Sequence, residues 1–295
     1  MSSIHAVINP TLSFTKLDIE KRLCMPAGRF TSAGPLFPLL CAVLLSVGFY
    51  AALIPLQETW FAQSFTQRGW VPYSIVFFSL WTMMIMLVKR HKIGVQQRAL
   101  SLRVVPEDAD FVMTAAAAGR TLERLHDLAD DPKNFLLFNR IQIALSNLRN
   151  IGRVSDVDEV LRGQAENDES MMESSYTVAR GLIWAIPVLG FIGTVLGLSQ
   201  AIGSFTGVLA QSSDIDTLKP ALQSVTAGLS TAFETTLQAL VAAVVIYMLM
   251  TAVKRTEEQM LDNMTEYCQR SIVARLKLPF ETPVKEAVYG TKIPA

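Results

Sequence analysis

Four polar residues recur at every fourth position near the start of the last long apolar stretch of the chain. On a helix, Thr226, Ser230, Glu234 and Gln238 share one face, because 3.6 residues make one turn. A charged group inside a membrane span costs about 2.5 to 3.5 kcal/mol on insertion scales, so it is normally faced towards a partner helix or a water path. The stripe therefore makes ion movement the first functional hypothesis.

Glu234 is the one acidic residue of this stripe, and three interpretations of it stay open. The carboxyl group could be protonated and satisfied inside a helix bundle. It could lie at the outer membrane interface, if the span begins after it. It could also take part in the passage of protons or cations, with a polar group of another subunit as its partner. Burial among apolar residues would favour the protonated form.

Threonines stand in both of the last two apolar stretches. Thr194 lies near the middle of the first of them, and Thr235 and Thr236 lie at a comparable depth in the second, which is antiparallel to it. A membrane threonine most often bonds back to a carbonyl of its own helix. Hydroxyl groups that face each other across two helices would instead line a path or coordinate a partly dehydrated cation. Thr194, Thr235, Thr236 and Glu234 are the predicted ion-pathway residues.

A proline and three spaced glycines precede and flank Thr194. Pro187, Gly190, Gly193 and Gly197 are the predicted helix-packing residues. Small residues let two helices approach closely in lipid, where dispersion and hydrogen bonds drive their association. Packing alone explains these glycines, and it is compatible with an ion path beside them.

Four apolar stretches dominate a chain of 295 residues that is 51% hydrophobic. A helix needs about 20 residues to cross a hydrocarbon core of about 30 Å, and each stretch reaches or approaches this length. We therefore predict an all-α, polytopic helical membrane protein with four transmembrane helices. The stretches are Leu36–Leu56, Val71–Val88, Leu182–Leu209 and Leu229–Val253.

Positive residues lie almost entirely on one side of these stretches. Of the 26 Lys and Arg residues, all but Arg68 and Lys219 fall in the two terminal segments and the long middle segment. The positive-inside rule places those segments in the cytoplasm. We predict that both termini are cytoplasmic.

The order of apolar and polar stretches predicts five regions. No helix breaker separates the middle segment from the third span, or the fourth span from residues up to Lys277, so both helices should extend into a cytoplasmic helical domain. Hydrophobic residues among charges near the start predict a short amphipathic helix at the membrane surface. The regions are a cytoplasmic N-terminal segment (1–33), a transmembrane hairpin (34–89), a cytoplasmic helical domain (90–178), a pore-forming transmembrane hairpin (179–253), and a cytoplasmic C-terminal helix and tail (254–295).

Several function classes have no support in the sequence. Cys24, Cys41 and Cys268 have no paired spacing, and the three histidines are scattered, so neither a disulfide framework nor a metal site is predicted. No nucleophile and base pattern or phosphate loop indicates an enzyme or a cofactor. A net charge of zero gives no reason to expect a nucleic-acid partner.

The last two spans resemble the MotA/TolQ/ExbB proton channel family. The resemblance rests on AIPVLGFIGTVLGLSQAIGSF at 185–205 and on GLSTAFETTLQALVAA at 228–243. It implies a homo-pentamer around two copies of a single-span subunit similar to ExbD, TolR or MotB, whose membrane aspartate would carry the ion. Thr194 and Thr236 match the family's pore threonines, and Thr235 is adjacent. The implied ion is H+, with Na+ as the alternative, since threonine hydroxyls suit both.

The resemblance implies a motor subunit rather than an enzyme. Ion flow past the threonines would drive rotation or force on a partner that reaches into the periplasm. Four spans with a large segment between the second and third resemble the MotA layout, but residues 89–178 lack a match to the rotor-contacting charges of flagellar stators. Glu234 and Ala239 stand where many members have a small or apolar residue and a glycine, respectively. A conventional channel or small-solute transporter and a structural membrane scaffold are the alternatives.

Overall fold

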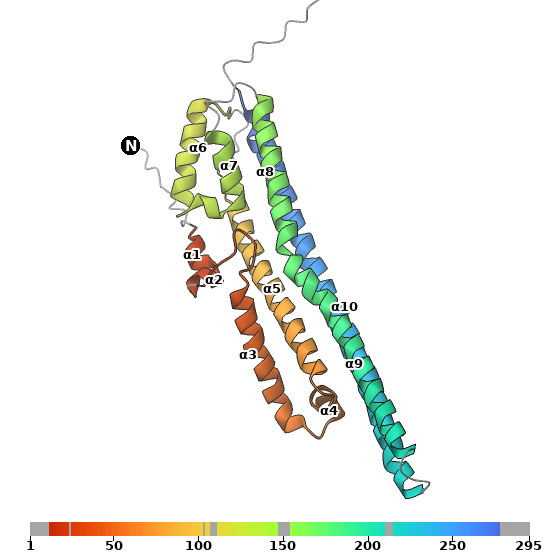
Figure 1. Cartoon of the computed structure of the whole chain (residues 1–295). Helices are drawn as coiled ribbons and strands as arrows, with labels where there is room; N and C mark the ends of the chain where they lie inside the picture. Colours follow the sequence, from red (N-terminus) through yellow and green to blue (C-terminus); the bar gives the residue numbers. More distant parts are fainter. Residues whose placement is uncertain are drawn as a thin grey trace, which may run out of the picture. The chain divides into compact units, whose positions relative to one another are not determined.

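The described part of the chain is helical. A computed structural model describes residues 12–23, 25–102, 104–106, 111–146, 154–209 and 215–277. These residues form helices and no β-strand, and four helical stretches are long and apolar enough to cross a membrane. The predicted all-α, four-span architecture is confirmed. The α-helices (Figure 1) are α1 Phe14–Leu17, α2 Ile19–Arg22, α3 Leu36–Leu53, α4 Trp60–Thr66, α5 Val71–Leu100, α6 Ala115–Leu128, α7 Leu136–Ser146, α8 Val154–Ser175, α9 Thr177–Leu209 and α10 Ile215–Ser271.

The chain divides into two compact units, each assembled from stretches far apart in sequence. Unit 1 comprises Met1–Ser13, Ala99–Asp168 and Leu261–Ala295. Unit 2 comprises Phe14–Arg98 and Glu169–Met260, and it contains the four apolar stretches. α10 contributes to both units: at 57 residues it is about 86 Å long, far more than the roughly 30 Å of a hydrocarbon core. α10 therefore continues well past its apolar stretch, as the sequence predicts.

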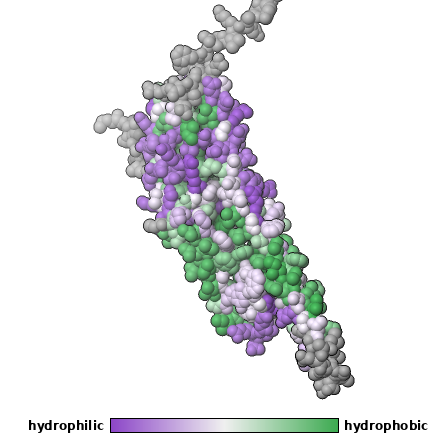
Figure 2. All heavy atoms as spheres, viewed as in Figure 1, coloured by the Kyte–Doolittle hydropathy of each residue, from purple (hydrophilic) through white to green (hydrophobic). Residues whose placement is uncertain are grey.

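The core of unit 2 lies where α5 meets α9 and α10. Val71 and Ile75 of α5 pack against Ile186 of α9 and a row of small and branched residues on α10. α3 packs against α5 through aromatic rings, and the rings of Tyr50 and Tyr73 stack with centroids 4.4 Å apart. Apolar side chains cover much of the surface of these helices in Figure 2. Such a surface suits a lipid environment or contact with further protein.

A buried polar cluster joins α5, α8 and α10. Lys89 of α5 contacts Glu257 of α10 at 3.1 Å and donates to Ser175 of α8 at 2.8 Å. Tyr176, the turn residue between α8 and α9, donates to Glu257 at 2.6 Å, and its ring lies under the Lys89 ammonium group. Lys89, Tyr176 and Glu257 are all buried. Because every charge has a partner, the cluster holds three helices without an unpaired buried ion.

The segment before the first span forms the short helices α1 and α2 and folds onto α5. Lys92 is buried and contacts Glu20 at 2.5 Å and Asp18 at 3.4 Å. Glu20 also accepts the backbone N–H of Gly34 at 2.7 Å, which closes the loop that leads into α3. Phe14 is buried as well. The sequence predicted one short amphipathic helix here, whereas the structure has two helices of four residues, and Asp18 and Glu20 are buried in ion pairs with Lys92. The position of charges along the sequence does not reveal such burial.

A buried ion pair joins helices of unit 1. Arg140 of α7 contacts Asp168 of α8 at 2.6 Å and donates to Thr265 of α10 at 2.9 Å. α6 begins at Ala115, where the Thr114 hydroxyl accepts the N–H of Ala117.

We predict that Lys92→Met destabilises unit 2 and releases the segment from Phe14 to Gly34. The substitution leaves Asp18 and Glu20 buried without a cation, which costs about 3 to 5 kcal/mol by analogy with other broken buried pairs. Thermal unfolding in detergent and limited proteolysis of the segment would measure this loss. Arg90→Met, an exposed change two residues away on α5, is the matched control. Equal stability of the two variants would contradict the ionic anchoring of this segment.

Candidate functional site: the α9–α10 seam

A seam of small residues brings α9 and α10 into close contact. A Cβ atom on Gly193 would lie only 2.3 Å from Thr235 Oγ1, and one on Gly190 would lie 2.5 Å from Ala239 Cβ. At Gly197 the nearest atom would be the carbonyl oxygen of Gly228, at 2.6 Å. A side chain at any of these three glycines would force the helices apart. The three glycines predicted to pack therefore lie at this contact.

Spacing along both helices explains why the seam forms. The glycines of α9 recur at three and four residues, and Gly228, Ala232, Thr235 and Ala239 recur at four, three and four on α10. Such spacing keeps small residues on one stripe of each helix. In lipid the hydrophobic effect does not drive helices together, so the dispersion contacts made by closely approaching backbones stabilise the pair instead. Pro187 stands half-buried within α9, one turn from the seam, and has no N–H to donate to the Ile183 carbonyl.

Two threonine hydroxyls converge on one carbonyl oxygen at this seam. Thr236 Oγ1 of α10 donates to the Gly190 carbonyl of α9 at 3.0 Å. Thr194 Oγ1 lies 3.5 Å from the same oxygen and donates to the Phe191 carbonyl at 2.6 Å. Both threonines are half-buried. The structure thus brings together two predicted ion-pathway residues from different helices, and each also bonds to its own helix.

Thr235 has a different place from its neighbour. Its side chain is buried against Gly193, and its hydroxyl donates to the Thr231 carbonyl of its own helix at 2.9 Å. Thr235 therefore fills the seam, while Thr236 stands at the seam's edge beside Thr194. Consecutive helical residues point about 100° apart, which accounts for the difference.

Glu234 lies on the other side of α10, away from Thr194 and Thr236. Residues two apart on a helix point about 200° apart, so Glu234 and Thr236 cannot face the same path. The Glu234 carboxylate accepts from Arg68 Nε and Nη2, each at 2.9 Å, and from the Ser230 hydroxyl at 2.7 Å. Its partner is therefore a cation in the same chain, which the sequence reasoning did not identify.

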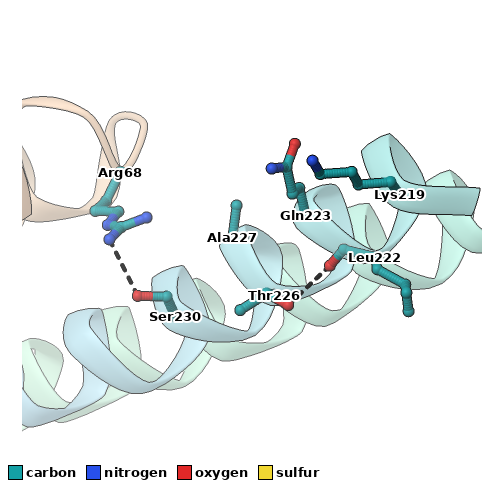
Figure 3. Close-up of a pocket in the computed structure, with 7 residues that line it drawn as sticks. All are labelled: Arg68, Lys219, Leu222, Gln223, Thr226, Ala227 and Ser230. Carbon is teal, nitrogen blue, oxygen red and sulfur yellow. Dashed lines mark hydrogen bonds between the residues drawn. The ribbon is translucent and has the colours of Figure 1, made fainter. Parts of the chain in front are cut away.

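Arg68 is the partner of Glu234 that sequence reasoning missed. It follows α4 in the loop between α4 and α5, and its side chain reaches Ser230 across a groove (Figure 3). The sequence feature that could have pointed to Arg68 is that it is the one Lys or Arg between the first two spans. Pairing it with Glu234 required knowing that this loop reaches α10, and neither periodicity nor charge gives that information. Among the described residues, no group of three His, Cys, Asp or Glu side chains is placed to hold a metal ion.

Comparison with known proteins gives one match. Residues 130–266 match the sequence model of the MotA/TolQ/ExbB proton channel family. This match confirms the resemblance drawn from the two polar spans, and it extends through the seam into the helical stretches on both sides. Searches of curated proteins and of solved structures each gave no significant match. The match supports a proton-channel-type function and, with the four apolar helices, a membrane location. Proteins of this family work in complexes with ExbD/TolR/MotB-type partners.

We predict that Gly193→Ala weakens the α9–α10 contact. The added methyl group would overlap Thr235, and overpacking of this kind costs about 1 to 3 kcal/mol. Gly181→Ala in the same helix is the matched control, because a Cβ there meets nothing within 4 Å. The control should be neutral or slightly stabilising, by up to about 1 kcal/mol of helix propensity. Thermal unfolding of the purified chains in detergent would measure both, and an unchanged Gly193→Ala variant would contradict the tight seam.

Proposed function

We propose that this chain, similar to the MotA/TolQ/ExbB proton channel family over residues 130–266, is a subunit of an ion-driven motor in the bacterial inner membrane. In this proposal, proton flow is coupled to rotation or force on a partner that reaches into the periplasm. The observation that supports it most directly is the pair of hydroxyls, Thr194 and Thr236, beside the Gly190 carbonyl oxygen.

The chemistry of this group suits a path for protons. A hydroxyl both donates and accepts hydrogen bonds, so Thr194 and Thr236 can hold a water molecule or a partner's carboxyl group without carrying charge themselves. The Gly190 carbonyl adds an acceptor, and its second lone pair leaves room for more than one donor. Oxygen atoms of this kind also suit Na+, so Na+ is the alternative ion.

The proposed assembly places the path between subunits. Five copies of the chain would surround two single-span subunits, and the aspartate of each single-span subunit would pass the threonine pair. Large apolar side chains on α9 and α10, including Trp184, Phe191 and Phe233, are exposed in the single chain, which supports contacts with neighbours or lipid. The distribution of Lys and Arg supports cytoplasmic termini. No feature of the described residues favours an enzymatic alternative.

We predict that Thr236→Val and Thr194→Val each abolish most of the ion flux. Valine keeps the shape of threonine and removes the hydroxyl, so the helices should still pack. Flux would be measured as pH change in membrane vesicles from cells that express the chain from its own locus, with and without Na+. Thr251→Val is the matched control, because Thr251 is an exposed α10 threonine bonded to its own helix. Normal flux in both Thr194 and Thr236 variants would contradict the proposed path.

A further inference from the structure

The loop between α4 and α5 is fastened to α10 by a dense set of polar contacts. Arg68 binds Glu234 through both carboxylate oxygens, and it also donates to the hydroxyls of Ser230 at 3.0 Å and Thr231 at 3.3 Å. A two-bond arginine–carboxylate fork fixes direction as well as distance, which a single ammonium contact does not. The side chains of Arg68 and Glu234 are 20% and 15% exposed, so the pair is largely shielded from solvent.

The polar stripe on α10 faces the end of α4 and the loop between α4 and α5. Four residues after Glu234, Gln238 donates to the Ser64 carbonyl of α4 at 3.0 Å. Thr226, at the other end of the stripe, bonds instead to the Leu222 carbonyl of its own helix. Ser230, Glu234 and Gln238 therefore contact the segment from Ser64 to Arg68. They do not face the threonine pair.

The stripe and the threonine pair act on different sides of one helix. α10 carries the glycine seam and Thr236 towards α9, and it carries Glu234 towards the loop. The loop thus holds α10 from the side away from Thr236. Farther along α10, the buried Lys89–Glu257 contact joins this helix to α5. These two ion pairs are separated by 23 residues of α10, or about 35 Å, so together they resist sliding of α10 along the first hairpin.

We propose that Arg68 and Glu234 are a positioning pair for the ion path, and that Glu234 does not itself carry ions. The pair keeps α10 in register with α9, so that Thr236 stays beside Gly190 and Thr194. An ion pair can do this at membrane depth because each charge satisfies the other, whereas either charge alone would be costly there. This inference rests on the proposed function, since it assigns the pair its role through the threonine path.

A charge exchange tests the positioning role. Arg68→Gln and Glu234→Gln should each lose most of the flux in vesicles that contain the chain with its native partners. The exchanged variant Arg68→Glu/Glu234→Arg should recover a large part of the flux, because it retains the combined length of the two side chains and their opposite charges. Arg68→Gln/Glu234→Gln should also exceed either single variant, since it leaves no unpaired charge. Lys219→Gln is the matched control, because Lys219 is an exposed cation lining the same groove (Figure 3), and it should leave flux unchanged.

Thermal unfolding of the purified chains gives a second readout that needs no partner. Each single variant should lower Tm by about 3 to 8 °C, and the exchanged variant should restore most of that loss. A Glu234→Gln variant with normal Tm and no flux, not rescued by the exchange, would overturn the inference and make Glu234 an ion carrier. Normal flux in both single variants would overturn it too. The Thr236→Val variant is measured in parallel. If the proposed ion path is wrong, Thr236→Val leaves the flux normal, and this result is distinguishable from failure of the positioning role.

Discussion

Close approach of α9 and α10 is the constraint on which the proposed site depends. Three glycines of α9 lie so near α10 that an added methyl group would overlap Thr235, Ala239 or the backbone at Gly228. This contact brings Thr236 within hydrogen-bond distance of the Gly190 carbonyl, next to Thr194. A wider spacing would separate the two hydroxyls. The small residues thus do more than pack: they place the polar atoms of two helices around one oxygen.

α10 makes different contacts on different faces. One stripe of small residues contacts α9, and Thr236 stands at an edge of that stripe. A polar stripe binds Arg68 of the loop after α4 through Glu234, and Ser64 of α4 through Gln238. The remaining apolar face, with Phe233 and Leu237, is exposed in the single chain. Two ion pairs, Arg68–Glu234 and Lys89–Glu257, then join α10 to the loop between α4 and α5 and to α5 itself. A helix fixed in this way can keep a weakly bonding hydroxyl pair in a constant position.

Much of the fold could be predicted from the sequence, because apolar length and helical period are local properties. The four spans, the continuous α10 and the stripe of small residues all follow from spacing along one helix. Pairings between distant residues could not be predicted. Glu234 with Arg68, Lys92 with Glu20 and Lys89 with Glu257 join residues 166, 72 and 168 positions apart. The stripe of Thr226, Ser230, Glu234 and Gln238 was visible, but its meaning depended on which segment it faces.

The central claim is that Thr194 and Thr236 border an aqueous ion path in the assembled protein. Cysteine accessibility tests it most directly, in a chain freed of its own cysteines and expressed with its native partners. Cysteines at positions 194 and 236 should react with a small, membrane-impermeant thiol reagent, whereas one at the exposed apolar residue Val244 should not, because lipid or a neighbouring helix would cover it. If positions 194 and 236 are as unreactive as position 244, the threonine pair is only a packing contact and the account is contradicted.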